Sequence, residues 1–210
     1  MTERLDTPSR TVSYETTASV PLTGDVPLAE VLGRIGDDYS RKGFFFRRHV
    51  RVLGEEFHAL REELEAPPVL GTYLPFADYP TRDYFRVIDR AARLQFPGLA
   101  MAEAHRRFGR EELGSFLEQV IARVAWSAFD DPMAVFVGYA ELAKRVMTRP
   151  HGHAKKIGER HARVEYHDSL GSIPYGIGVF EGVVLAFKQH PRIAVTFDGS
   201  VLRYDVRWTL

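Results

Sequence analysis

The sequence contains no cysteine, which excludes disulfide bonds, thiolate metal sites and cysteine nucleophiles. It also lacks an excess of either charge: 28 Lys and Arg residues face 28 Asp and Glu residues, so no overall field attracts nucleic acid or anionic lipid. No apolar run approaches the roughly 20 residues of a membrane span. The polar residues 1–10 are followed by no apolar signal core. These absences predict a soluble, cytoplasmic protein that binds no nucleic acid and does not span a membrane.

A chain of 210 residues suits one domain with an N-terminal extension. We assign residues 1–40 to the extension and residues 41–210 to a single helical, α+β domain. Within the extension, apolar and polar residues alternate from Val12 to Val20, which predicts a strand. Asp25 and Pro27 then suit the start of a short helix.

The middle of the chain has the apolar periodicity of helices, at residues 81–96, 99–108, 111–129 and 133–147. Gly109 is expected to end the second of these helices. An aromatic run, Phe44 to Phe46, lies among basic residues. It predicts a helix start whose phenylalanines enter the core; a nucleic-acid or membrane-facing patch is the alternative. The acidic segment 55–65 follows directly and favours the core, because it cancels the local positive charge.

The C-terminal residues predict a strand at 161–167, a helix at 175–188 and a hairpin at 192–208. In the hairpin, the Asp198-Gly199 turn signal pairs Val195 with Leu202 and Arg192 with Asp205. The region 149–158 is expected to be a basic loop. The fold class is therefore α+β: an N-terminal helical bundle packed on a small antiparallel sheet, with a strand–helix–hairpin unit at the C-terminus.

The helix at 175–188 is apolar on nearly all sides and should be buried. Its residues Gly178, Gly182 and Ala186 lie at spacing i, i+4 and i+8, and so share one face. Glycine in a helix costs roughly 1 kcal/mol relative to alanine, which predicts that this face approaches a sheet, a partner helix or a ligand closely. A homodimer or another protein partner could use the same face.

Four histidines lie between residues 149 and 167, and His151 and His153 have a spacing common in metal sites. His161 and His167, however, are separated by about 20 Å on one strand, at roughly 3.3 Å per residue. We predict no metal site and no catalytic residue: the sequence has no nucleophile elbow, no His-Glu-x-x-His motif and no carboxylate pair at a defined spacing.

Nucleotide motifs are incomplete. The glycines at 176 and 178 would need a third at 181 for a dinucleotide fingerprint, where Glu181 stands. Arg145 and Arg149 match the Arg-x-x-x-Arg element of PilZ domains, which bind cyclic di-GMP, but residues 167–172 lack the partner motif. Six basic residues between 145 and 163 face one acid and form a candidate anion patch: Arg145, Arg149, Lys155, Lys156, Arg160 and Arg163.

Four segments carry a family resemblance: Asp78-Tyr79-Pro80, residues 104–110, residues 178–182 and residues 204–208. With them the chain from Gly43 to Trp208 resembles a myxobacterial family of domains of unknown function. The order of helices, strand, helix and hairpin is more distantly similar to haem–nitric-oxide/oxygen-binding domains and to 4-vinyl-reductase-type ligand domains. This second resemblance implies a fold, and by itself transfers no function.

The haem-binding family has a proximal histidine on the helix before the strand, and a Tyr-x-Ser-x-Arg motif after it. Here the helix at 133–147 has no histidine, and Tyr139 is its only plausible ligand. After Tyr166 the serine is displaced to position 169 and the arginine is missing. We therefore predict no haem and no other cofactor.

The leading hypothesis is a non-enzymatic small-molecule-sensing or signalling-adaptor module that binds an apolar ligand. The ligand pocket is predicted between the helices at 133–147 and 175–188, lined by Phe136, Tyr139, Phe180 and Val184. One alternative is an oligomeric scaffold, and another is a protein that binds a nucleotide second messenger or other anion through residues 145–163. An enzyme of unrecognised type is the remaining alternative.

Overall fold

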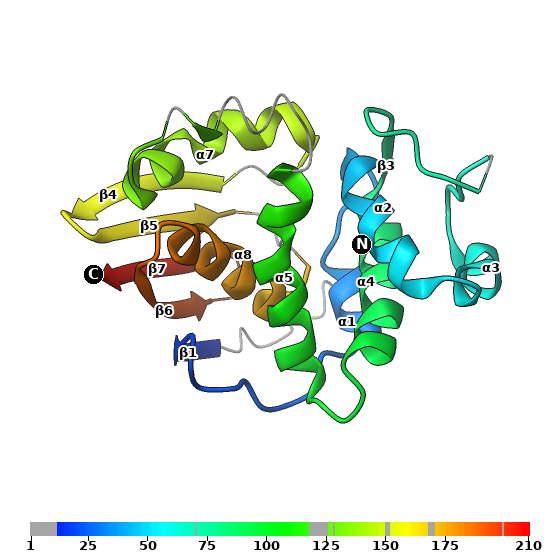
Figure 1. Ribbon diagram of the computed structural model, residues 1–210, viewed down its shortest axis with the longest axis horizontal. Coiled ribbons are helices and arrows are strands. Elements are labelled where there is room, and N and C mark those ends of the chain that lie inside the picture. Colours follow the sequence, from blue (N-terminus) through cyan, green and yellow to red (C-terminus); the bar gives the residue numbers. More distant parts are fainter. Residues whose placement is uncertain are drawn as a thin grey trace, which may run out of the picture.

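The computed structural model describes the chain in seven segments: residues 12–69, 71–117, 126–127, 129–149, 152–167, 171–198 and 200–210. Figure 1 shows two halves with one long helix, α5, between them. The sheet half contains β1 (Val12–Thr17), α7 (Pro132–Val146), β4 (Gly152–Gly158), β5 (His161–Tyr166), α8 (Ile173–Ala186), β6 (His190–Phe197) and β7 (Leu202–Thr209). The fold class is α+β, as predicted.

The helical half of the chain precedes α5 (Met101–Leu117) in sequence. It contains α1 (Leu28–Gly33), β2 (Ser40–Lys42), α2 (Phe44–Leu53), α3 (Glu56–Leu60), the 3₁₀ turn Arg61–Glu63, β3 (Asp78–Pro80) and α4 (Thr81–Gln95). The aromatic run at the start of α2 is buried, with Phe46 fully so, which confirms that it enters the core. Strands β2 and β3 pair in a short antiparallel ladder that the sequence did not predict.

Helix α5 corrects one expectation, because it runs through Gly109 without a break. The glycine packs directly on the backbone carbonyl of Tyr175 in α8, and an added Cβ would overlap that oxygen. Gly109 therefore serves close helix packing, and does not end a helix. The predicted helix at 111–129 falls partly on residues 118–125, which lie outside the described residues.

The main sheet has the strand order β1-β6-β7-β5-β4, and all neighbouring strands are antiparallel. The expected loop at 149–158 is instead the edge strand β4, paired with β5, which corrects the prediction. The other edge is β1, whose residues confirm the strand predicted in the N-terminal segment. The boundary drawn at residue 40 stays a prediction. In the described part of the chain, no helix is both long and apolar enough to cross a bilayer.

The hairpin of β6 and β7 has a different register from the predicted one. Val195 lies opposite Tyr204, not Leu202, and Arg192 lies opposite Arg207, not Asp205. The connection is longer than two residues, because the Asp198 carboxylate accepts hydrogen bonds from the backbone N–H groups of residues 200 and 201. The shift is two residues, so every side chain keeps its predicted face.

The small-residue face of α8 packs on α5 within the same chain. A Cβ added at Gly178 would overlap the carbonyl oxygen of Arg106, and one added at Gly182 would lie 2.6 Å from that of Arg110. The prediction of close approach to a partner helix is confirmed. The prediction that Gly178, Gly182 and Ala186 form a surface for a second protein is wrong, because α5 covers both glycines.

Candidate functional site

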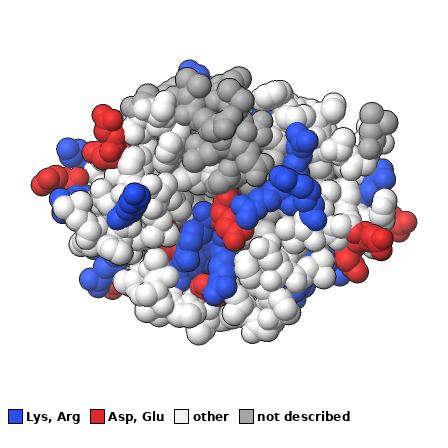
Figure 2. Space-filling model, in the orientation of Figure 1, with Lys and Arg blue, Asp and Glu red and all other residues white. Residues whose placement is uncertain are grey.

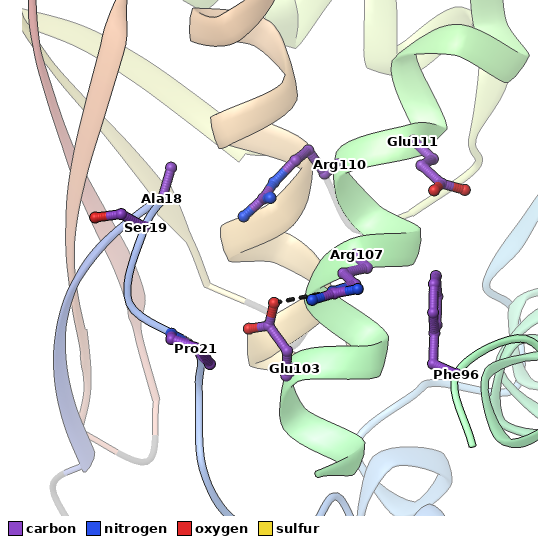
Figure 3. Close-up of a pocket in the computed structure, with 8 residues that line it drawn as sticks. All are labelled: Ala18, Ser19, Pro21, Phe96, Glu103, Arg107, Arg110 and Glu111. Carbon is purple, nitrogen blue, oxygen red and sulfur yellow. Dashed lines mark hydrogen bonds and ion pairs between the residues drawn. The ribbon is translucent and has the colours of Figure 1, made fainter. Parts of the chain in front are cut away.

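A surface pocket of about 280 Å³ lies over α5, between the N-terminal segment and the end of α4. Figure 3 shows Ala18, Ser19 and Pro21 on one side of α5 and Phe96 on the other. The floor comes from α5 itself, which contributes Glu103, Arg107, Arg110 and Glu111. The pocket is therefore built from three segments, of which residues 18–21 lie far from the other two in the sequence.

Two guanidinium groups reach this pocket from successive turns of α5. Arg107 donates from Nε to Oε1 of Glu103 at 3.2 Å, and its guanidinium lies 5.5 Å from the ring centroid of Phe96. Arg110 donates from Nε and Nη2 to Oε2 of Glu181, at 3.3 and 2.8 Å. The Arg107 side chain is 43% exposed and that of Arg110 is 27% exposed. Both can reach solvent or a ligand.

The two carboxylates of the pocket are already engaged. Glu103 accepts hydrogen bonds from the backbone N–H of Leu22 at 2.9 Å and from Arg106 at 3.3 Å, besides Arg107. Burial opposes its ionisation, but the Leu22 N–H and the two guanidinium groups outweigh it and hold the pKa of Glu103 below its ordinary value. Glu111 forms an ion pair with Arg48 of α2.

One buried polar cluster lies beneath the pocket, between α5 and α8. Arg106 and Glu181 are both fully buried and form a bidentate pair, with Nε to Oε2 at 2.8 Å and Nη2 to Oε1. The same guanidinium donates to the carbonyl oxygens of Thr17 and Val20, each at 2.6 Å. We call these residues, with Glu103, the Arg106–Glu181 cluster. It fastens the N-terminal segment to both helices.

A second buried cluster joins α5 to the helical half, and its centre is the Tyr84 hydroxyl. That hydroxyl donates to Oε2 of Glu112 at 2.7 Å, and lies 3.0 Å from the Tyr175 hydroxyl and 3.1 Å from Nε2 of His49. The Arg41 guanidinium stacks over the Tyr84 ring at 4.0 Å. We call these five buried residues the Tyr84 cluster.

Ionisation in the Tyr84 cluster follows from burial and from the charges it contains. Burial raises the pKa of both tyrosines well above the ordinary value, so both hydroxyls stay protonated. Burial also opposes the ionisation of Glu112, but His49, Arg41 and the Tyr84 hydroxyl together lower its pKa. Three buried atoms have no hydrogen-bond partner within the described residues: Arg41 Nε, His49 Nδ1 and Glu112 Oε1.

Sequence reasoning missed both clusters, although each left a signal. Glu181 is the only charged residue in α8, so it stands out in an otherwise apolar buried helix. His49 and Glu112 likewise lie on buried faces of their helices. A lone ionisable residue on a buried face requires a partner, but the identity of that partner depends on the tertiary structure.

The predicted apolar pocket between α7 and α8 is occupied by packed core side chains where it is described. The rings of Phe136 and Phe180 lie 5.9 Å apart, and Val184 is fully buried in the same hydrophobic cluster. The side chain of Tyr139 lies outside the described residues. The ligand pocket at these residues stays a prediction.

The structure divides the predicted anion patch. Arg163 forms a bidentate pair with Asp205, at 3.0 and 3.1 Å, and Lys155 lies 3.5 Å from Glu165. Arg149, at the far end of the patch, lies 3.7 Å from Asp38. The remaining members, Arg145, Lys156 and Arg160, are exposed. Binding of an anion by this patch stays a prediction.

The described histidines of the same region do not gather at one point. His161 bonds Asp205 at 2.8 Å, and the rings of His153 and His167 are 6.3 Å apart. His151 lies outside the described residues. Among the residues that the structure does describe, no three His, Asp or Glu side chains are grouped as a metal site would need.

Comparison with protein families matches residues 34–209 to the model of a family described as "Protein of unknown function (DUF2378)". The chain belongs to this family. The match spans the helical half from the end of α1, the long helix α5 and the sheet except β1. It includes the Tyr84 cluster and residues 103, 106 and 181 of the other cluster, whereas Thr17 and Val20 precede it. No curated protein matches the sequence.

Solved structures of H-NOX proteins share the fold. One, from S. oneidensis in the Fe(II)NO ligation state, has a TM-score of 0.63 at 14% identity, covering 80% of this chain and 99% of its own. A mutant of the T. tengcongensis H-NOX protein has a TM-score of 0.58 at 20% identity, covering 80% and 98%. The Fe(II) unliganded protein from K. algicida has a TM-score of 0.57 at 11% identity, covering 80% and 97%. At these identities the likeness shows the fold alone.

The described residues do not fit the haem that this resemblance implies. Helix α7 contains no histidine, and no histidine lines the pocket over α5. Two histidines are fully buried in the described part of the chain, and both have polar partners: His49 bonds Tyr84, and His105 Nδ1 lies 3.0 Å from the Ser172 hydroxyl. No step of the function proposed below involves haem.

Proposed function

We propose that this protein is a non-enzymatic ligand-sensing domain that binds a small molecule in the pocket over α5. The observation that carries the proposal is the construction of that pocket from three separate segments, residues 18–21, Phe96 and α5. A ligand touching all three would change how they are held together. The H-NOX-like fold supports a sensing role by analogy only.

Helix α5 is suited to pass such a change to the rest of the molecule. It touches the N-terminal segment through Arg106, the helical half through Glu112 and α8 through direct backbone packing at Gly178. Backbone contacts at a glycine face leave little room for independent movement of α5 and α8. A displacement of α5 should therefore move α8 and the sheet with it.

The chemistry of the pocket favours binding over catalysis. A general base works best with a pKa near the operating pH, whereas the pKa of Glu103 is lowered. Glu111 is held in an ion pair with Arg48. Glu103 is therefore not poised to take a proton near neutral pH.

The test is a thermal-shift and native mass spectrometry screen of a small-molecule library against the purified protein. We expect at least one compound to raise the melting temperature and to remain bound. Ser19→Phe, which places a large side chain at a residue that lines the pocket, should abolish the effect. Val20→Phe is the matched control, because Val20 is exposed at 58% and does not line the pocket. A screen without any binder sensitive to Ser19→Phe would overturn the proposal.

The same screen tests the predicted apolar ligand between α7 and α8. A hydrophobic compound whose binding survives Ser19→Phe but is lost in Phe180→Ala would favour that location. A nucleotide or other anion whose binding is lost in Arg149→Gln would favour the predicted anion patch instead.

A further inference from the structure

The pocket over α5 is lined by two arginines and two glutamates, and the ion-paired network to which they belong contains more positive than negative charge. Its ion pairs join four arginines, Arg48, Arg106, Arg107 and Arg110, to three glutamates, Glu103, Glu111 and Glu181. One positive charge is therefore in excess. Figure 2 shows blue side chains gathered at the centre of this face, where α5 lies in Figure 1.

The N–H donors of the two pocket arginines that have no described partner also favour an anionic ligand. Arg107 uses only Nε on a described partner, and Arg110 uses Nε and Nη2. A guanidinium carries five N–H donors, so both terminal groups of Arg107 and one of Arg110 remain for a ligand. The carboxylates that line the pocket already accept bonds from arginines. The hydrogen-bonding groups of the pocket that remain unused are therefore N–H donors of arginine.

The size and walls of the pocket restrict the rest of the ligand. A volume of about 280 Å³ lies just below the roughly 300–1,000 Å³ typical of ligand sites. A dinucleotide is too large for it. The ring of Phe96 and the side chains of Ala18 and Pro21 provide apolar contacts opposite the arginines.

From these observations we infer that the pocket binds a small organic acid, with its carboxylate on Arg107 and Arg110 and its apolar body against Phe96. This inference rests on the function proposed above and names the ligand class for that site. A planar guanidinium matches a carboxylate through two parallel hydrogen bonds, which a neutral amide cannot reproduce.

The test uses benzoate, phenylacetate and hexanoate, each beside its neutral primary amide, and inorganic phosphate. Calorimetry should show that at least one acid binds, and that its amide binds at least about tenfold more weakly. Arg107→Gln should weaken binding of that acid about tenfold, and Arg107→Lys should weaken it less, because lysine keeps the charge but loses the planar fork. Arg207→Gln, a matched change at an exposed arginine on the sheet, should leave binding unaltered.

Three outcomes overturn the inference and separate it from the proposed function. An amide that binds as tightly as its acid, or phosphate that binds in place of the acids, removes the organic-acid assignment. If no acid binds while a library compound binds in a manner sensitive to Ser19→Phe, the ligand class is wrong and the sensing function stands. If the library also yields no such compound, both the ligand class and the sensing function are wrong.

Discussion

The two buried clusters that flank α5 differ in how completely their polar groups are satisfied. In the Arg106–Glu181 cluster, the guanidinium has partners at Nε, Nη1 and Nη2, and both oxygens of Glu181 accept hydrogen bonds. In the Tyr84 cluster, three buried polar atoms have no partner within the described residues. The first cluster is a fully hydrogen-bonded connection between segments, whereas the second retains unsatisfied polar groups in the core.

The more complete hydrogen bonding of the Arg106–Glu181 cluster indicates that α5 is held more rigidly on that side. A fully hydrogen-bonded buried pair costs several kcal/mol to break from one side, because the remaining charge stays buried. Breaking an incompletely satisfied network costs less free energy, because some of its buried polar groups make no hydrogen bond in the folded state. We therefore expect α5 to stay fixed to α8 and the N-terminal segment, and to shift more readily against the helical half.

The largest effect should come from forcing α5 away from α8. In Gly178→Val, the new side chain would overlap the carbonyl oxygen of Arg106, so the Arg106–Glu181 cluster cannot close. We expect loss of the cooperative folded state in circular dichroism melts. Gly33→Ala is the control, because nothing lies within 4 Å of its added Cβ. A Gly178→Val protein that melts like wild type would show that the two helices do not pack as described.

The second-largest loss of stability should come from removing one partner from the Arg106–Glu181 cluster. Arg106→Met leaves the buried Glu181 with Arg110 as its arginine partner and removes one donor from each of the carbonyls of Thr17 and Val20. We expect a loss of about 3–5 kcal/mol in the free energy of unfolding, measured with urea. The double variant Arg106→Met/Glu181→Met should recover part of that loss. Equal losses in the single and double variants would contradict a tightly coupled pair.

A smaller effect is expected in the Tyr84 cluster. Glu112→Gln keeps the shape of the side chain and one oxygen for the Tyr84 hydroxyl, but removes the charge opposite His49 and Arg41. The expected cost is about 1–3 kcal/mol by urea unfolding. Hydrogen exchange should quicken in α2 and α4 more than in α8. Faster exchange in α8 instead would reverse the comparison between the two sides of α5.

The smallest expected effect is on the pH dependence of stability, through the Tyr84 cluster. The pKa of Glu112 is lower in the folded protein than its ordinary value. Its stabilising contribution is therefore fully present above the ordinary carboxylate pKa and is lost as pH falls through the lowered value.

Glu103 has a lowered pKa as well, so wild type should lose stability on acidification. Urea unfolding between about pH 6 and about pH 3 should show a shallower loss in Glu112→Gln, because glutamine does not titrate. Identical slopes in the two proteins would show that Glu112 contributes nothing to the acid sensitivity.

Much of the local structure follows from the sequence. The period-two pattern of Ala162, Val164 and Tyr166 predicts a strand with one buried face, and all three are fully buried. The amphipathic pattern at 81–96 predicts α4 nearly to its ends. These features depend on the spacing of neighbouring residues along one element, which is visible in the chain itself.

Other features depend on contacts that the periodicity of a single element does not show. Strand β4 is mostly exposed and lacks an apolar alternation, and it becomes a strand because β5 pairs with it. The hairpin register depends on hydrogen bonds made by the Asp198 side chain. Gly109 resembles a helix stop in the sequence, but it lies inside α5, where α8 packs closely against it.

The candidate pocket belongs to this second group. The sequence alone determined an α+β fold, a buried apolar helix at α8 and the absence of cysteine chemistry. Only the tertiary structure placed residues 18–21 and Phe96 on either side of α5, and set Arg106 against Glu181. The physical reason is that periodicity records which face of an element is buried, whereas the partner of a buried charge and the walls of a pocket depend on which elements meet in space.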